Sequence, residues 1–160
     1  MFEMLAQTPY AEWVRESLWG WPLALTVHAF GTAAVIGLIF IIGLRVVGLF
    51  RTIPYTSLNR LFPIIWTGVV LQVMSGFSLW MTKPEQYVGA GMFLAKFTFV
   101  VTGIVVTAFF QNTIRRDAAA WDAAGTVSSR GAKFAAAAAL VWAAVLVTGR
   151  LTAYLGSLYA

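Results

Sequence analysis

Four long apolar segments constrain the fold of this chain more than any other feature. They cover residues 19–47, 58–81, 90–114 and 131–155, and a helix needs roughly 20 such residues to cross the hydrocarbon core of a bilayer. Hydrophobic residues make up 60% of the chain and charged residues only 11%, whereas soluble domains carry about 25% charged residues. The sequence therefore predicts an all-α integral membrane protein, a four-helix transmembrane bundle.

Residues 1–18 precede the first span and are predicted to form an N-terminal tail. From Pro9 onward the tail has the pattern of a short interfacial helix, because apolar side chains such as Tyr10 and Trp13 alternate with charged ones. We therefore expect two regions, the tail and a single transmembrane domain over residues 19–160.

The basic residues predict the orientation of the bundle in its membrane. Seven of the eleven lysines and arginines lie at the connections between spans one and two and between spans three and four, whereas the tail and the connection between spans two and three hold only Arg15 and Lys83. Loops that face the cytoplasm carry the excess of Lys and Arg. We therefore expect a multi-pass protein of the bacterial inner (cytoplasmic) membrane with both termini on the periplasmic side.

Composition also excludes several classes of function. The chain has no cysteine, which removes disulfides, thiolate metal sites and iron–sulfur clusters. Its net charge of +5 comes from basic residues that cluster in the loops between spans, as membrane topology requires. We therefore expect the lipid bilayer as a partner and no nucleic acid. The spans contain no Asp or Glu, and the sequence shows no phosphate loop and no nucleophile beside a base, which disfavours proton-coupled transport and hydrolysis.

Three ionisable residues remain inside the predicted spans: His28, Lys96 and Arg150. Such a group costs on the order of 3 kcal/mol in the hydrocarbon and is a functional candidate by default. At about 1.5 Å rise per residue, all three lie roughly 10 Å from the same membrane face. They can therefore meet in one layer of the periplasmic half of the bundle.

The surroundings of these residues suit a flat cofactor. Gly31 and Thr32 follow His28 by one helical turn and leave a small face, and Tyr154 follows Arg150 by one turn. An imidazole beside two cations within apolar walls matches haem b, with His28 on the iron and the cations on the propionates. Lys96 as a neutral amine, or Met74, could instead be the second iron ligand, and the sequence leaves these roles open.

Short motifs in this chain resemble a known group of proteins. The first span, HAFGTAAVIGLIFIIGLRVVG, and the segment AKFTFVVTG are similar to helices of small four-helix bacterial membrane proteins of the CopD-like and HemJ-like (protoporphyrinogen oxidase-type) superfamily, with matches at His28, Arg45 and Lys96. The ending VTGRLTAYLG, with Arg150 and Tyr154, resembles the closing helix of an uncharacterised branch. The resemblance implies a haem b site with His28 as an axial iron ligand. HemJ-type proteins usually carry further histidines, so neither bis-histidine ligation nor protoporphyrinogen oxidation carries over to a chain with one histidine.

These observations predict a haem-binding membrane subunit for electron transfer or redox sensing, working with other membrane or periplasmic redox proteins. If the protein is an enzyme, we expect an oxidoreductase. A first alternative is copper handling, with Cu(I) held by His28 and the thioethers of Met74, Met81 or Met92. A second is a cofactor-free structural or assembly subunit, in which rows of small residues serve helix association within the bundle or in a homo-oligomer.

Overall fold

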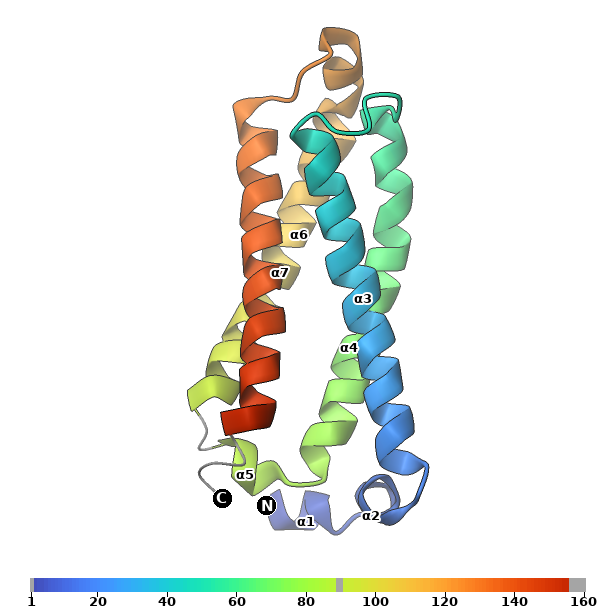
Figure 1. Cartoon of the computed structure of the whole chain (residues 1–160), viewed down its shortest axis with the longest axis vertical. Helices are drawn as coiled ribbons and strands as arrows, with labels where there is room; N and C mark the ends of the chain where they lie inside the picture. Colours follow the sequence, from blue (N-terminus) through green and yellow to red (C-terminus); the bar gives the residue numbers. More distant parts are fainter. Residues whose placement is uncertain (1, 89–90, 156–160) are drawn as a thin grey trace.

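The computed structural model describes residues 2–88 and 91–155 and shows a bundle of four long helices (Figure 1). These are α3 (Gly20–Val46), α4 (Phe62–Met81), α6 (Gly91–Ala124) and α7 (Ser129–Leu155). Each is long and apolar enough to cross a membrane, α4 together with the turn that precedes it. The regular elements of the described residues are all helical, and the prediction of an integral membrane four-helix bundle is confirmed.

Four short helices complete the described chain and lie at the two ends of the bundle. The helices α1 (Phe2–Ala6), α2 (Pro9–Glu16) and α5 (Pro84–Val88) lie at the end where α7 finishes, which we call the terminal end (Figure 1). The 3₁₀ helix η1 (Tyr55–Leu61) and the connections before it and after α6 lie at the opposite end, which we call the loop end.

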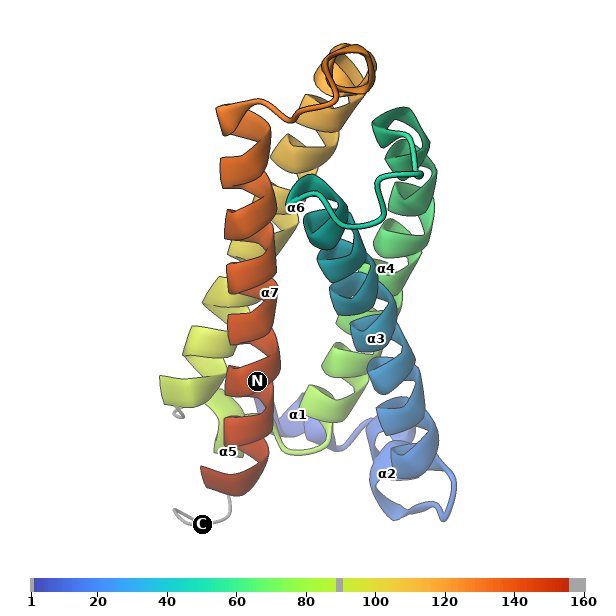
Figure 2. The same cartoon turned by 45° about the horizontal axis from the view of Figure 1, so that its top comes forward.

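The long helices are arranged as two hairpins. The helix α3 packs along α4, and α6 packs along α7, while the two hairpins meet through contacts of α3 with α7 and of η1 with α6. Figures 1 and 2 show the two hairpins close together towards the loop end and separated towards the terminal end. The bundle is therefore tightly closed at one end only.

The apolar core accounts for this asymmetry, because it fills the loop-end half of the bundle. Its members are mostly large apolar side chains that become buried where all four helices and η1 approach one another. Two hydrogen bonds tie the helices together beside it: Trp66 Nε1 donates to Gln111 Oε1 at 2.9 Å, and Trp142 Nε1 donates to Thr107 Oγ1 at 2.9 Å. The core includes Val35, Ile39, Ile42, Leu58, Phe62, Ile65, Phe110, Ile114, Ala138, Trp142 and Val145.

Trp142 is the largest fully buried side chain of this core. We expect Trp142→Ala to lower the free energy of unfolding by about 3 kcal/mol, because it leaves a cavity and removes the hydrogen bond to Thr107. Reversible unfolding in mixed detergent micelles measures this change. Trp19→Ala is the control, since Trp19 is 67% exposed, and equal losses in the two variants would contradict the assignment of Trp142 to the core.

The helix α6 continues beyond the predicted end of its span. The sequence predicts that the third span ends near residue 114 and that a polar connection follows, but the helix runs on to Ala124. The extra segment is rich in alanine, the strongest helix former, and Trp121 packs its ring edge-on against Tyr55 at a centroid distance of 5.8 Å. Gly125 then ends the helix at φ +68°, a conformation that favours glycine.

The predicted interfacial helix of the tail corresponds to α2. Thr8 begins it, because its Oγ1 accepts a hydrogen bond from Ala11 N at 3.3 Å. Ala11 and Val14 are fully buried against the bundle, whereas Trp13 is 48% exposed. The helix therefore lies across the terminal end with one side on the bundle and its aromatic side outward, as an interfacial helix does.

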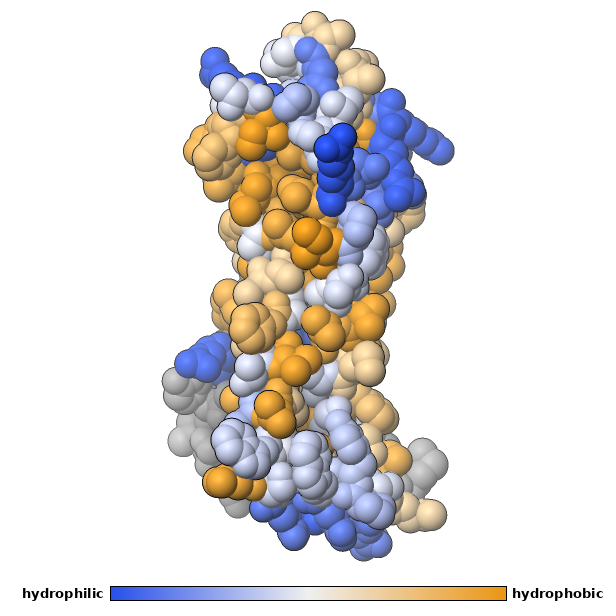
Figure 3. Space-filling view, turned by 90° about the vertical axis from the view of Figure 1, so that its right-hand side faces the viewer, coloured by the Kyte–Doolittle hydropathy of each residue, from blue (hydrophilic) through white to orange (hydrophobic). Residues whose placement is uncertain are grey.

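The surface agrees with a position in a bilayer. Figure 3 shows a mostly apolar zone along the middle of the molecule and hydrophilic residues at both ends. Large apolar side chains of the long helices are exposed, among them Phe30 at 69% and Leu140 at 71%. Lipid tails would cover such side chains, so the exposed apolar surface needs no protein partner.

Candidate functional site

His28 lies in the terminal-end half of the bundle and faces α4. Its Nδ1 atom is 3.0 Å from Ser75 Oγ, and Ser75 is 5% exposed. The Ser75 hydroxyl donates its own proton to the main-chain carbonyl of Leu71, at 2.5 Å. His28 is thus held by a side chain that already uses its single proton elsewhere.

The contacts of Ser75 favour one tautomer of the imidazole. With the Ser75 hydroxyl donating to Leu71, Ser75 Oγ is an acceptor for a hydrogen on His28 Nδ1. In this tautomer the lone pair is on Nε2. A histidine that donates from one ring nitrogen to the protein and presents the other as a lone pair is oriented as metal-ligating histidines are.

Two glycines give the His28 segment its close approach to α4. A Cβ atom at Gly31 would lie 2.8 Å from the carbonyl oxygen of Gly68 and 2.9 Å from Gln72 N, and a Cβ atom at Gly76 would lie 3.3 Å from His28 Cε1. Gly31 was expected to leave room for a cofactor, but the helix α4 takes up this space. Thr32 Oγ1 donates to the His28 carbonyl at 2.8 Å, so this hydroxyl is bound within its own helix.

Lys96 approaches α7 at the same level of the bundle. A Cβ atom at Gly149 would lie 3.5 Å from Lys96 Nζ, which places the ammonium group beside the residue that precedes Arg150. The charge of Lys96 also acts on the His28 imidazole, so the two groups lie within electrostatic range. Arg150 is exposed on α7, and the side chain of Tyr154 lies outside the described residues.

The terminal-end half of the α6–α7 hairpin has no fully buried side chain among its described residues. Along α6 the first buried residue is Gly103, and along α7 the last is Val145. The segments 91–102 and 146–152 are therefore only partly covered, in the half where the two hairpins separate (Figure 2). Since protein interiors are normally close-packed, this half of the bundle offers surfaces that an apolar ligand can cover.

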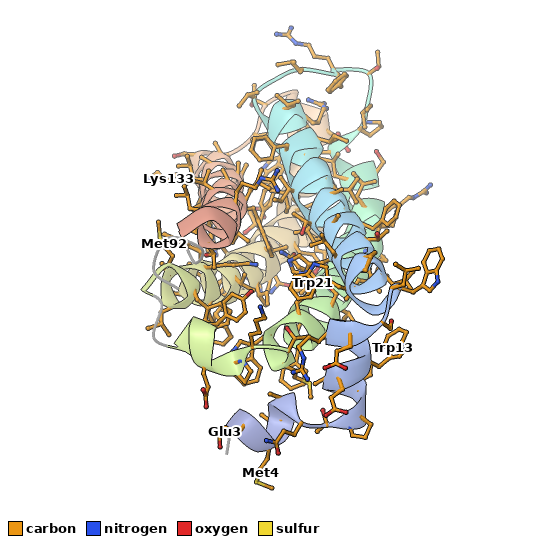
Figure 4. The ribbon with its side chains drawn as sticks, turned by 60° about the horizontal axis from the view of Figure 1, so that its bottom comes forward. Glu3, Met4, Trp13, Trp21, Met92 and Lys133 are labelled. Carbon is orange, nitrogen blue, oxygen red and sulfur yellow. The ribbon has the colours of Figure 1, made fainter. Side chains whose placement is uncertain are left out.

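The methionines considered for a metal do not gather around His28. Met74 is 63% exposed and Met81 is 8% exposed, at separate positions along α4. Met92 lies in the first turn of α6, on the side of the bundle away from Trp13 of α2 (Figure 4). The described residues also hold no group of three or more His, Cys, Asp or Glu side chains that could bind a metal ion. A metal ion bound to His28 would therefore need most of its ligands from a cofactor and not from the described side chains.

Gln72 is a member of this site that the sequence analysis does not identify. Its side chain is 5% exposed, and its Oε1 atom is buried without a hydrogen-bond partner among the described residues. A buried acceptor without a partner costs about 1–3 kcal/mol. Gln72 lies three residues before Ser75, and its main chain packs against Gly31, so this residue belongs to the same contact between α3 and α4 as His28. The only sequence signal is an amide side chain within an otherwise apolar span.

The site therefore consists of the His28 imidazole held against Ser75, Lys96 within electrostatic range of it and beside Gly149, and Arg150 next to Gly149 along α7. These groups lie in the loosely packed half of a membrane bundle. Comparisons with protein-family models, with curated proteins and with solved structures found no match to this chain.

Proposed function

We propose that this protein binds haem b in the terminal-end half of the bundle and serves as an electron-transfer or redox subunit. The observation that carries the proposal is the hydrogen bond between His28 Nδ1 and Ser75 Oγ. In the tautomer in which Nδ1 donates, the Nε2 lone pair is left for the iron. Haem when bound supplies one-electron redox chemistry. Because the porphyrin provides four iron ligands itself, the isolated imidazole fits haem better than a bare metal ion.

The two cations would orient the haem by attracting its propionates. Haem propionates are anionic, and Lys96 and Arg150 lie on the other hairpin, where their positions along the spans predict the same depth as His28. Positive charge at this depth attracts propionates and repels a copper ion, which favours haem over copper. Lys96 has the reach of a flexible four-carbon chain, and it remains our candidate for the second axial ligand if its amine is neutral.

The side of the membrane and the family follow as parts of the same proposal. The loop end carries most of the basic residues, including Arg51, Arg115 and Arg116, and the rule for basic loops puts this end in the cytoplasm. The haem would then lie in the periplasmic half of a bacterial inner membrane, as the resemblance to CopD-like and HemJ-like proteins implies. Periplasmic or membrane redox proteins would be the partners.

The absorption spectrum of the purified protein tests this proposal. We expect protein expressed with ample haem and purified in detergent to show a Soret band, with α and β bands after reduction by dithionite. Metal analysis of the same sample should give about one iron per chain and no copper above background. A featureless visible spectrum would overturn the proposal, and copper without iron would favour the copper-handling alternative.

A further inference from the structure

A hollow of about 910 Å³ opens at the loop end, far from His28 along the bundle. It is bounded by the last turn of α3, the connection 47–54, the start of η1 and the end of α6. Two cations and one carboxylate line it, Arg45, Arg51 and Asp122, together with Tyr55 and Trp121. None of these residues lies in the proposed haem site.

Arg45 is the buried cation of this hollow. The sequence analysis places it at the end of the first span, and the structure shows that its side chain is only 7% exposed. Its Nε donates to the Ile53 carbonyl at 2.6 Å, and its guanidinium carbon lies 3.7 Å from the ring centroid of Tyr55. No described residue accepts a hydrogen bond from its Nη groups, which belong to the lining of the hollow.

Asp122 does not neutralise Arg45 by direct contact. Its two carboxylate oxygens accept hydrogen bonds from the backbone N–H groups of Tyr55, at 2.6 Å, and Thr56, at 3.1 Å. No ion pair within 4.0 Å joins it to Arg45 in the described part of the chain. The charge of Arg45 nevertheless acts on Asp122. A buried cation without a contacting counter-ion is costly, so an anion at the Nη groups of Arg45 would be stabilised.

The connection 47–54 adds a second cation, Arg51, and its side chains indicate how deep the hollow would lie in a membrane. Gly48, at φ +97°, turns the chain so that Arg51 Nε donates to the Gly48 carbonyl at 3.1 Å. Apolar side chains beside Arg51 point outward, with Val47 72% exposed and Phe50 52% exposed. Apolar side chains next to a basic one are typical of the boundary between acyl chains and headgroups.

We propose that this hollow binds a phosphate group, held by the guanidinium groups of Arg45 and Arg51. The planar guanidinium fork matches the oxygens of a phosphate and forms charge-assisted hydrogen bonds with it. The hollow lies at the depth where phospholipid phosphates are found, so the group comes from an anionic phospholipid or from a free phosphate. Asp122 stays bonded to the backbone of η1 and keeps the first turn of that helix in place beside the phosphate.

Binding of three probes to the detergent-purified protein tests the site. The probes are dioctanoyl phosphatidylglycerol, dioctanoylglycerol, which has the same chains without the phosphate, and inorganic phosphate. Native mass spectrometry measures the lipids, and calorimetry measures the phosphate. We expect the phosphatidylglycerol to bind about tenfold more tightly than dioctanoylglycerol, and Arg51→Gln to remove about tenfold of that affinity, as the loss of a hydrogen bond to a charged group does.

Arg116→Gln is the matched control, because Arg116 is exposed on α6 at the same end of the bundle but does not line the hollow. Its affinity for phosphatidylglycerol should equal that of the unchanged protein. Inorganic phosphate binding that is lost in Arg51→Gln identifies a free phosphate as a ligand, whereas binding of phosphatidylglycerol alone identifies the lipid. Equal binding of the two lipids, or equal losses in the two variants, would overturn the proposal.

Discussion

His28→Ala is expected to abolish the Soret band of the haem-loaded protein, and free imidazole added to the variant is expected to restore it. The substitution removes the Nε2 ligand but leaves the helix intact, because alanine is the best helix former. An imidazole molecule can then occupy the space and ligate the iron. Optical titration with haem measures the loss, and the same titration with imidazole measures the rescue.

Ser75→Ala keeps His28 but removes its hydrogen-bond partner, so this variant tests whether the orientation of His28 matters for haem binding. Ser75 is the partner of His28 Nδ1, and loss of such an outer partner weakens metal binding about tenfold or more. Ser78→Ala is the matched control, since Ser78 lies on the same helix and bonds to Tyr10 at 2.8 Å instead. A haem affinity that falls equally in both serine variants, or a Soret band that persists in His28→Ala without imidazole, would contradict ligation by His28.

Gly31→Ala is expected to lower the free energy of unfolding by about 1–3 kcal/mol, the usual cost of overpacking. The new Cβ would lie 2.8 Å from the Gly68 carbonyl oxygen and 2.9 Å from Gln72 N. Both are main-chain atoms that cannot rotate away, so α3 and α4 must move apart. The shift also separates His28 from Ser75, and haem affinity should fall together with stability.

Gly37→Ala provides the control on the same helix. Nothing lies within 4 Å of a Cβ atom at Gly37, and replacing a helical glycine by alanine stabilises by about 0.5–1 kcal/mol. The two variants carry the same chemical change and should therefore shift stability in opposite directions. Unfolding in mixed micelles and haem titration of both variants check this, and a loss of stability in Gly37→Ala as large as that in Gly31→Ala would refute close packing at Gly31.

The sequence by itself determined the membrane fold. Length and apolarity are local properties, and a bilayer accepts only segments that satisfy all backbone hydrogen bonds internally, so four apolar runs predict four spanning helices. The same local reasoning identified His28 and Lys96 as ionisable residues inside spans. It underestimated the length of α6, although the alanines before Gly125 favour a helix.

Only the tertiary structure decided which faces of the helices meet. The partner of His28 is Ser75, 47 residues away in the chain, and the burial of Arg45 depends on Tyr55 and the connection before η1. Gly31 likewise serves the contact with α4 and not an open pocket. Such contacts follow from the rotation and register of packed helices, which hydrophobicity within the bilayer does not specify because lipid tails are as apolar as the side chains.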